Sequence, residues 1–360
     1  MKKTNIIPIF VPHLGCPQDC VFCNQRRITG QIESKSSLEI TNYIEKYLSY
    51  FKNKEIEKEI AFYGGSFTAI DQKYRKELLE IAKSYKDKNI IQSIRISTRP
   101  DYINEEILSQ LCDYGVDIIE LGIQSMDDNV LRLSNRGHSA KDSKIAVNLI
   151  RENKYFSLGL QQMIGLPGEN YESMLFTTRE IIDMKPDFVR IYPTLVIKDT
   201  ELHDQFLTDT YKPLSLEDAV NRTSKLIAFY YAKNIDIIRI GLQNTDEIAR
   251  DKDVLAGPFH ESFRELAEGR FLRDIILNFY NRLNLNFENL EVLASNRNIS
   301  LISGHKGMNK KYLYEHLKLK KIKLRSIPCS ENLIFISDFI NKYKILIDKE
   351  AKNIIELDES

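Results

Sequence analysis

The 360-residue sequence predicts an α/β fold in which a parallel sheet is followed by a small C-terminal α/β appendage. Two observations predict it. Between residue 6 and about residue 240, short β-branched or aromatic runs alternate with longer stretches of helical periodicity, which is typical of βα units. From about residue 284 the pattern changes to short strands, which indicates a separate small domain.

Six strand and helix repeats make up the first part of the chain. We expect the strands at residues 6–11, 60–63, 91–97, 116–122, 156–164 and 187–192. We expect the helices between them at residues 38–51, 72–85, 105–114, 140–153 and 171–184. Short connections of this kind suit a partial (β/α)6 barrel, but a doubly wound open sheet has the same local pattern.

The second part of the chain is expected to begin with a helix at 216–233, a strand at 235–240 and a helical segment at 259–281. Short strands are then expected at 291–294, 299–302 and 321–327. We therefore divide the chain into a core barrel at 1–240, a helical extension at 241–283 and a small basic α/β domain at 284–360.

Charge and hydropathy exclude several classes of protein. Equal numbers of basic and acidic residues, 51 of each, argue against a protein that coats nucleic acid indiscriminately. No apolar run approaches the roughly 18–20 residues that span a bilayer, and the first residues lack a signal-peptide cleavage pattern. We therefore expect a cytoplasmic protein with no membrane partner, in which the three cysteines that lie within eight residues of one another favour metal ligation over disulfides.

Three of the five cysteines lie in one loop, rich in turn-forming residues, after the first expected strand. Cys16, Cys20 and Cys23 have the spacing C-x3-C-x2-C. Three thiolates on one loop are able to hold three irons of a [4Fe–4S] cluster and leave the fourth iron without a protein ligand. An open iron is able to bind S-adenosylmethionine (SAM), so that one electron breaks a carbon–sulfur bond and yields a 5′-deoxyadenosyl radical.

A zinc site is the alternative interpretation of this loop. Structural zinc takes four protein ligands, and the nearest fourth candidate, His13, precedes the loop. Cys112 and Cys329 are far away in the sequence and are expected to be buried small apolar residues. The spacing therefore favours the cluster.

The ends of the expected strands offer groups that could hold SAM. The second strand ends near Gly64-Gly65, where the backbone is able to approach a ligand closely. The fourth ends near Gln124-Ser125, and the guanidinium of Arg136 downstream could pair with the SAM carboxylate. The backbone around Ile164 could frame the adenine. Taken singly, these segments are equally compatible with ordinary turns and, for Arg136, with a solvated helix end.

Together these motifs resemble the radical SAM superfamily, and within it the group that contains the catalytic subunit of the Elongator complex and its shorter bacterial relatives. The matching segments are, in order, the cysteine loop and residues 64–67, 97–102, 120–125, 135–138, 164–168, 190–197 and 259–267. The resemblance implies the partial (β/α)6 barrel that periodicity left undecided. It also implies an external one-electron donor.

The resemblance implies a set of SAM contacts. Phe22, the aromatic residue before the third cysteine, is expected to pack beside the adenine. Ser97 stands where the Elongator subunit has a glutamate, so one polar contact to the bound nucleoside is either missing or replaced. The complete expected set is Phe22, Gly64, Gly65, Ser97, Gln124, Ser125, Arg136 and Ile164.

The same resemblance implies tRNA or another structured RNA as the substrate. Weak candidates for the substrate face lie at or beyond the sixth strand, and they are Tyr192, Lys198, His260 and Arg264. Tyr192 could instead be an aromatic that fills the barrel. The Elongator subunit carries an acetyltransferase domain after its barrel, and the residues here after Arg270 lack its phosphate-cradling glycine pattern. We therefore do not expect carboxymethylation of wobble uridine from this chain alone.

A basic segment near the C-terminus is the second candidate for contact with RNA. Residues 306–325 contain eight basic residues against one acidic residue, a local charge of +7, with tyrosines and a histidine interleaved. Phosphate contacts are assigned to Lys310, Lys311, Lys320 and Lys321. A solvated helix followed by an edge strand, whose lysines discourage edge-to-edge pairing, explains the same pattern.

The sequence therefore predicts a radical SAM enzyme with a [4Fe–4S] cluster that acts in the modification of tRNA or other RNA. Two alternatives stay open at this point. One keeps the radical chemistry but changes the substrate to a small metabolite or a tetrapyrrole. The other is a haem or cluster chaperone that kept the barrel and lost turnover.

Overall fold

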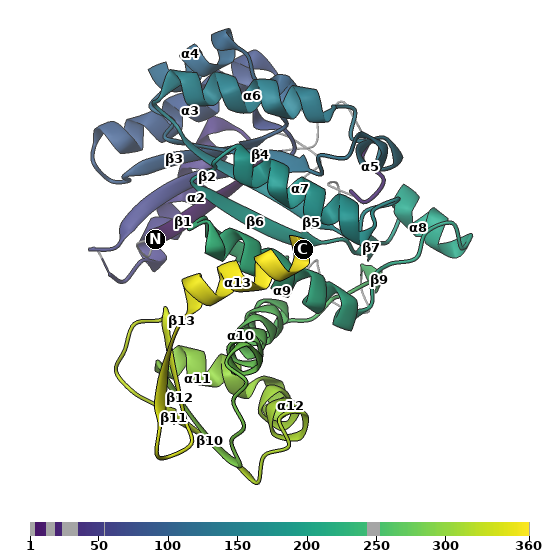
Figure 1. The fold of residues 1–360 in the computed structure, drawn as a ribbon. Coiled ribbons are helices and arrows are strands. Elements are labelled where there is room, and N and C mark those ends of the chain that lie inside the picture. The colour runs from purple at the N-terminus through teal and green to yellow at the C-terminus, as the bar shows by residue number, and fades with distance from the viewer. Residues whose placement is uncertain (1–3, 12–18, 24–34, 54, 243–252, 360) are drawn as a thin grey trace. The chain divides into compact units, whose positions relative to one another are not determined.

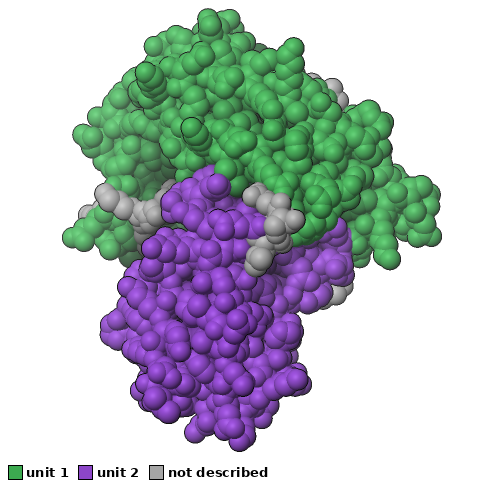
Figure 2. Space-filling model, in the orientation of Figure 1, with its two compact units in different colours: residues 1–213, 242–257 green, residues 214–241, 258–360 purple. Residues whose placement is uncertain are grey.

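The computed structural model describes residues 4–11, 19–23, 35–53, 55–242 and 253–359. The chain divides into two compact units, which are coloured separately in Figure 2. The first unit contains Met1–Pro213 and Leu242–Gly257, and the second contains Leu214–Gly241 and Pro258–Ser360. Residues 214–240, which the sequence pattern groups with the barrel core, belong by their contacts to the second unit.

The first unit is built on six parallel strands, which confirms the six strands expected from the sequence. They are β1 (Thr4–Val11), β2 (Glu57–Gly64), β3 (Ser93–Thr98), β4 (Ile118–Gln124), β5 (Ser157–Ile164) and β6 (Phe188–Pro193). They pair in the order in which they occur in the chain. A doubly wound sheet reverses its strand order at a switch point, whereas sequential order is that of a partial barrel. The fold is therefore a curled half-barrel.

Helices connect the strands and lie along one side of the sheet (Figure 1). They are α2 (Ser37–Tyr50), α3 (Gln72–Asp87), α4 (Glu105–Asp113), α5 (Asp128–Leu133), α6 (Ala140–Asn153) and α7 (Tyr171–Asp183). Each begins after a residue whose side chain accepts a backbone hydrogen bond from the first turn, which satisfies one of the unpaired N–H groups there. These capping residues are Ser36, Asp71, Asn104, Asp127, Ser139 and Asn170.

The sheet has two chemically different faces because successive side chains point to opposite sides and the strands pair in register. One face is apolar, and its side chains are at most 3% exposed: Ile7, Ile9, Ile60, Phe62, Ile94, Ile96, Ile119, Leu121, Leu158, Leu160, Val189 and Ile191. Buried under the helices, they form the core of this unit. The other, inner face carries Glu59, Arg95, Glu120, Gln161 and Arg190.

After β6 the chain of the first unit continues through a small peripheral region. It contains the two-residue strand β7 (Val196–Ile197), α8 (Glu201–Leu207) and β9 (Val254–Ala256), and β7 and β9 pair antiparallel. Thr200 caps α8. This region supplies apolar side chains to the cysteine-bearing segment described below.

The second unit is organised around the long helix α10 (Phe263–Arg282), which packs against four other helices. These are α9 (Leu216–Ala232), α11 (Asn296–Ser303), α12 (Met308–His316) and α13 (Ile347–Glu359). The unit also contains β8 (Asp236–Ile240). Throughout the described ranges, no helix is both long and apolar enough to cross a membrane.

A four-stranded sheet in the order β11-β10-β12-β13 completes the second unit. Its strands are β10 (Asn289–Ala294), β11 (Lys321–Ser326), β12 (Leu333–Ser337) and β13 (Lys342–Leu346). The expected strands at 291–294 and 321–327 are confirmed. The expected strand at 299–302 is wrong, because these residues lie in α11, where the Ser295 side chain accepts from Asn298 N–H and starts the helix. A short apolar run alone does not distinguish a strand from a buried helix.

Gly159 on the inner face of β5 provides a test of this packing. A Cβ at position 159 would overlap the ring of Phe188, and that ring in turn lies 5.1 Å from the guanidinium of Arg95. We expect Gly159→Ala to lower the free energy of unfolding by about 1–3 kcal/mol, because the overlap must push the ring aside.

The measurement is urea unfolding of Gly159→Ala in the wild-type and Phe188→Leu backgrounds. The smaller leucine leaves room for the new methyl group, so the cost of Gly159→Ala should fall to less than half in that background. An equal cost in both backgrounds would show that the overlap with Phe188 is not its cause.

Candidate functional site: a cysteine-bearing turn and a polar inner face

Two of the three clustered cysteines lie on one tight turn. Cys23 N–H donates to the Cys20 carbonyl at 2.9 Å, and Cys20 is only 5% exposed. Cys16 lies outside the described residues. Within the described ranges, no group of three or more His, Cys, Asp or Glu side chains could hold a metal ion.

The segment that follows α5 holds this cysteine turn in place. Ser134 accepts from Val21 N–H at 3.2 Å through its carbonyl, and Asn135 Nδ2 donates to the Asp19 carbonyl at 2.8 Å. Arg136 Nη1 lies 3.2 Å from Cys20 Sγ. Three consecutive residues therefore hold three positions of the turn through hydrogen bonds. Asn135 has a φ of +51°, a left-handed conformation that asparagine tolerates better than most residues.

Val21 anchors the same turn from its other side. Its side chain is buried among Val196, Leu202 and Tyr211, and Phe22 packs against the edge of that cluster. Leu202 N–H also donates to the Val21 carbonyl at 2.7 Å. The cysteines are thus flanked by a polar clamp and by an apolar anchor. The structure places Phe22 at this anchor, next to Cys23, and the expected contact of Phe22 with adenine stays a prediction.

The glycine turn at the end of β2 is joined to the end of β3 by hydroxyl groups. Gly64 has a φ of +106°, which favours glycine, and Gly65 continues the turn. Just beyond, Ser66 Oγ and Thr98 Oγ1 share a hydrogen bond of 2.7 Å, and Thr68 Oγ1 lies 2.6 Å from the same threonine oxygen. The backbone of the two glycines is therefore held at the carboxyl edge of the sheet.

Gln124 and Arg136 each carry a buried polar atom without a hydrogen-bond partner among the described residues. Gln124 is 8% exposed, has a φ of +70° at the end of β4, and its Oε1 has no hydrogen-bond partner among the described residues. Arg136 Nη2 donates to the Gly122 carbonyl at 2.5 Å, whereas its Nε has no partner in the same part of the chain. A buried polar atom without a partner costs about 1–3 kcal/mol. Both atoms fit a polar ligand beside the cysteine turn.

Ser125 and Ile164 form hydrogen bonds within the protein that stabilise this edge of the sheet. Ser125 Oγ lies 3.2 Å from Thr177 Oγ1 and accepts from Asp127 N–H at 3.1 Å. The Ile164 carbonyl accepts from Thr194 N–H at 2.9 Å and from Thr194 Oγ1 at 2.8 Å. The structure thus places Gly64, Gly65, Gln124, Ser125 and Ile164 at the carboxyl ends of β2, β4 and β5 or directly after them. Arg136 follows α5 and reaches the end of β4 through its bond to the Gly122 carbonyl.

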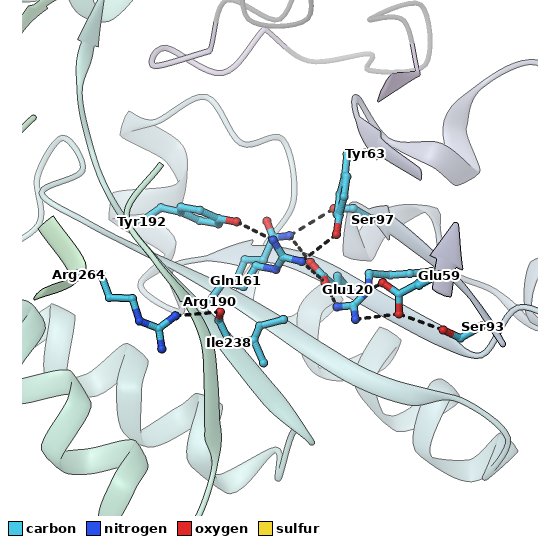
Figure 3. A network of polar contacts seen from close by, with 11 residues as sticks. Glu59, Tyr63, Ser93, Ser97, Glu120, Gln161, Arg190, Tyr192, Ile238 and Arg264 are labelled. Carbon is cyan, nitrogen blue, oxygen red and sulfur yellow. Dashed lines mark hydrogen bonds and ion pairs between the residues drawn. The ribbon is translucent and has the colours of Figure 1, made fainter. Parts of the chain in front are cut away.

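A charged network crosses the inner face of the sheet (Figure 3). At its centre, Glu120 accepts from Arg95, from Arg190 Nη2 at 2.7 Å and from Gln161 Nε2 at 3.1 Å. Arg95 also donates to both carboxylate oxygens of Glu59, at 2.7 and 3.1 Å. Two carboxylates and two guanidinium groups therefore balance one another in a largely buried layer.

Two phenols extend the network toward the carboxyl ends of the strands. Arg190 Nη2 donates to Tyr63 Oη at 3.0 Å and Arg190 Nη1 donates to Tyr192 Oη at 3.3 Å, and Figure 3 shows both phenols directed at the guanidinium. Ser97 Oγ accepts from Gln161 Nε2 at 3.3 Å. Burial raises the pKa of Tyr63, so its phenol is protonated at neutral pH.

Sequence reasoning singled out Tyr192 and Ser97 in this network and missed Tyr63, Glu120 and Arg190. A signal was available, because Arg95, Glu120 and Arg190 each stand between two apolar residues in β3, β4 and β6, so that charged and apolar positions alternate there. On strands otherwise read as fully buried, such alternation indicates a second, polar face.

The other substrate candidates lie on several different elements. Lys198 is exposed after β7, and its N–H donates to the Asp253 carbonyl. In the second unit, His260 Nδ1 accepts from Ser262 N–H at 3.0 Å. Arg264 pairs with Glu268 at 2.9 Å and donates to the Ile238 carbonyl at 3.2 Å, which indicates a structural tie to β8.

The four lysines assigned to phosphate contacts are all exposed, on α12 and at the start of β11. β11 is an edge strand, as the alternative interpretation of the basic segment predicts. Acidic residues outside the segment offset part of its charge. Glu288 lies 2.9 Å from Lys320, and Glu291 lies near Lys323 and Arg325 at 3.8 and 3.7 Å.

His138, two residues after Arg136, provides a pH test of this site. Burial, followed by the nearby charges of Arg136 and Arg99, lowers the pKa of His138 from 6.5 to about 3. Between these two values the unfolded chain binds a proton that the folded protein does not, so stability falls as the pH decreases. From pH 7 to pH 5, we expect His138 to account for about 2 kcal/mol of lost unfolding free energy.

The measurement compares urea unfolding of wild type and His138→Gln, both without cofactors, at the two pH values. The glutamine cannot titrate, so the variant should lose correspondingly less stability on acidification. The same pH dependence in both proteins would contradict a buried neutral histidine.

Sequence profiles of known families match most of the chain. The Radical SAM superfamily profile matches residues 10–181, and the Radical_SAM C-terminal domain profile matches residues 186–273. Among solved structures, the archaeal Elp3 of Methanocaldococcus infernus, with an N-terminal deletion, superposes with a TM-score of 0.57 at 21% identity. That match covers 79% of this chain and 64% of the other. It supports the likeness of the fold.

Curated relatives point in the same direction. An uncharacterized protein of Methanocaldococcus jannaschii is 31% identical over 223 residues, which cover 59% of this chain and 68% of the relative. The tRNA uridine(34) acetyltransferase of M. infernus is 33% identical over 189 residues, which cover 51% of this chain. Human Elongator complex protein 3 is 28% identical over 190 residues, which cover 47% of this chain. The chain spans about a third of the length of these last two proteins, 34% and 35%. By its profiles, its relatives and its half-barrel, this chain belongs to the radical SAM superfamily of enzymes.

Proposed function

We propose that Cys16, Cys20 and Cys23 hold a [4Fe–4S] cluster, and that the enzyme uses it on SAM in the modification of tRNA. The observation that carries this proposal is the clamped cysteine turn beside the buried, partnerless Gln124 Oε1 and Arg136 Nε. When bound, the cluster supplies the electron that cleaves SAM to a 5′-deoxyadenosyl radical.

The neighbouring residues have separate tasks in binding SAM. Gln124 Oε1 is an acceptor suited to the amino group, and Arg136 Nε is a donor suited to the carboxylate. Gly64 and Gly65 are half-buried and have no side chain, so their backbone allows close approach of the ligand. Ser97, Ser125 and Ile164 shape the wall on which the nucleoside lies, and Phe22 supplies an apolar surface beside the adenine.

The substrate part of the proposal rests on the relatives and on the basic segment. Two relatives are named tRNA uridine(34) acetyltransferase. In this chain Lys310, Lys311, Lys320 and Lys321 are exposed, and the acidic partners of Lys311 and Lys320, Glu315 and Glu288, are themselves exposed to solvent. Such exposed pairs are worth about 0–1 kcal/mol, so phosphate groups are able to replace them.

Removal of one clamped cysteine tests the cluster. Anaerobically reconstituted wild type should contain about four irons per chain, and with a reductant it should form 5′-deoxyadenosine from SAM. Cys20→Ala should lose both the iron and the product, because three ligands are needed. The matched control is Cys112→Ala, which removes a free, half-buried thiol on α4.

The control should keep the iron content and the rate of wild type. Iron retained in Cys20→Ala would contradict the ligand assignment. Stoichiometric haem binding without SAM cleavage in wild type would instead favour a chaperone.

Charge reversal on the basic segment tests the RNA contact. Replacing Lys310, Lys311, Lys320 and Lys321 together by Glu should weaken tRNA binding at least tenfold and flatten its salt dependence, because fewer counterions are released. The matched control reverses four exposed lysines of the first unit with the same change in net charge: Lys73 and Lys76 on α3, Lys88 directly after α3, and Lys141 on α6.

Binding is measured by anisotropy of labelled tRNA over a range of salt concentrations. The control should bind within about twofold of wild type if the effect is local. Equal losses in both variants would mean that only net charge matters, and tRNA binding that survives the first set would exclude the basic segment as the RNA site.

A further inference from the structure

The inner face of the half-barrel ends in a small group of hydrogen-bond donors that the proposed binding of SAM does not use. Arg190 lies between the phenols of Tyr63 and Tyr192, at 3.0 and 3.3 Å, and its side chain is 12% exposed. Tyr63 and Tyr192 are likewise half-buried. All three side chains therefore keep a part of their surface available to a ligand.

Arg190 also has an unmet hydrogen bond. Its Nε is buried and has no partner among the described residues, although both Nη atoms are bonded. A buried N–H donor without a hydrogen-bond acceptor is unfavourable, unless a ligand or a water molecule accepts its hydrogen bond. The group therefore offers one N–H and two hydroxyl groups, which suits a ligand that presents acceptor atoms.

The charge balance on the inner face restricts the kind of hydrogen-bond acceptor that these donors are able to bind. Arg190 is paired with Glu120, and Arg95 is shared between Glu120 and Glu59, so the guanidinium charges are already matched by carboxylates. An anionic group placed here would meet Glu120 without a free positive charge to offset it. Neutral carbonyl oxygens fit better than a phosphate or the carboxylates of a tetrapyrrole.

We propose that Tyr63, Arg190 and Tyr192 form a specificity site that binds the carbonyl edge of a uracil base in RNA. This inference rests on the proposed function in one respect, that the substrate is a uridine-containing RNA. The donors hydrogen-bond to the carbonyl oxygens of uracil. Both phenol oxygens already accept from Arg190, so each hydroxyl is left to donate to the ligand. Cytosine presents an amino group where uracil has its O4 carbonyl, so cytosine would place a donor against a donor of the site.

The test uses cofactor-loaded enzyme and two RNA stem–loops that differ by uridine or cytidine at one loop position. The readouts are the KM for each stem–loop in RNA-stimulated formation of 5′-deoxyadenosine, and the rate without RNA. Wild type should prefer uridine about tenfold or more, as expected when one buried polar contact is mismatched.

Two variants each remove one hydroxyl donor and keep the ring, Tyr63→Phe and Tyr192→Phe. A third, Arg190→Lys, removes the Nε–H donor and keeps the positive charge opposite Glu120. Each should raise the KM for the uridine stem–loop about threefold to tenfold and reduce the preference over cytidine. Each should leave the rate without RNA within about twofold, because these side chains bond within the polar layer, whereas the cysteine turn is held by Ser134, Asn135 and Arg136. The matched control is Tyr85→Phe, a buried phenol that donates to Glu45 at 2.6 Å between α3 and α2.

The outcomes separate this inference from the function on which it rests. If wild type responds to the uridine stem–loop but all three variants keep its KM and its preference for uridine, the specificity site alone is overturned. A wild type that cleaves SAM but responds to neither stem–loop overturns the RNA substrate and this site together. An equal loss in Tyr85→Phe would mean that any buried hydroxyl matters, and would overturn the assignment to these three residues.

Discussion

The balance of charges on the inner face of the sheet is the constraint on which the first unit depends. Glu59, Arg95, Glu120 and Arg190 come from four different strands, and each buried charge has a partner of opposite sign. Removing one partner of such a pair typically lowers the free energy of unfolding by about 3–5 kcal/mol, because the other charge stays buried without a counter-charge. The strands must therefore keep their register, and that register also sets where each strand ends and where its last residues lie.

The cysteine turn uses this rigid frame. Arg136 joins Cys20 to the Gly122 carbonyl near the end of β4, and Asn135 and Ser134 hold the neighbouring backbone. Because β4 also carries Glu120, a single strand links the polar layer to the cysteine turn. A site built on strand ends is held more precisely than one built on loops alone, which suits chemistry that must place a reactive group beside one atom of a substrate.

Much of this arrangement was predictable from the sequence, and the remainder depended on long-range contacts. Periodicity predicted all six strands of the half-barrel, and the spacing of the cysteines and the glycine pair indicated the strand ends at which the proposed site lies. The strand expected at residues 299–302 proved helical because a capping serine outweighed a short apolar run. The pairing of Arg190 with Glu120, 70 positions earlier, and the acids that offset the lysines of β11 belong to no local pattern.

The central claim is that a SAM-cleaving site at the strand ends of this half-barrel acts on a base in tRNA. The most direct test incubates reconstituted enzyme, SAM and reductant with total RNA from cells that lack the gene, followed by mass spectrometry of the nucleosides. The account predicts that a uridine-derived nucleoside changes in the tRNA fraction with wild type and stays unchanged with Cys20→Ala. An unaltered nucleoside profile, from enzyme that forms 5′-deoxyadenosine under the same conditions, would contradict it.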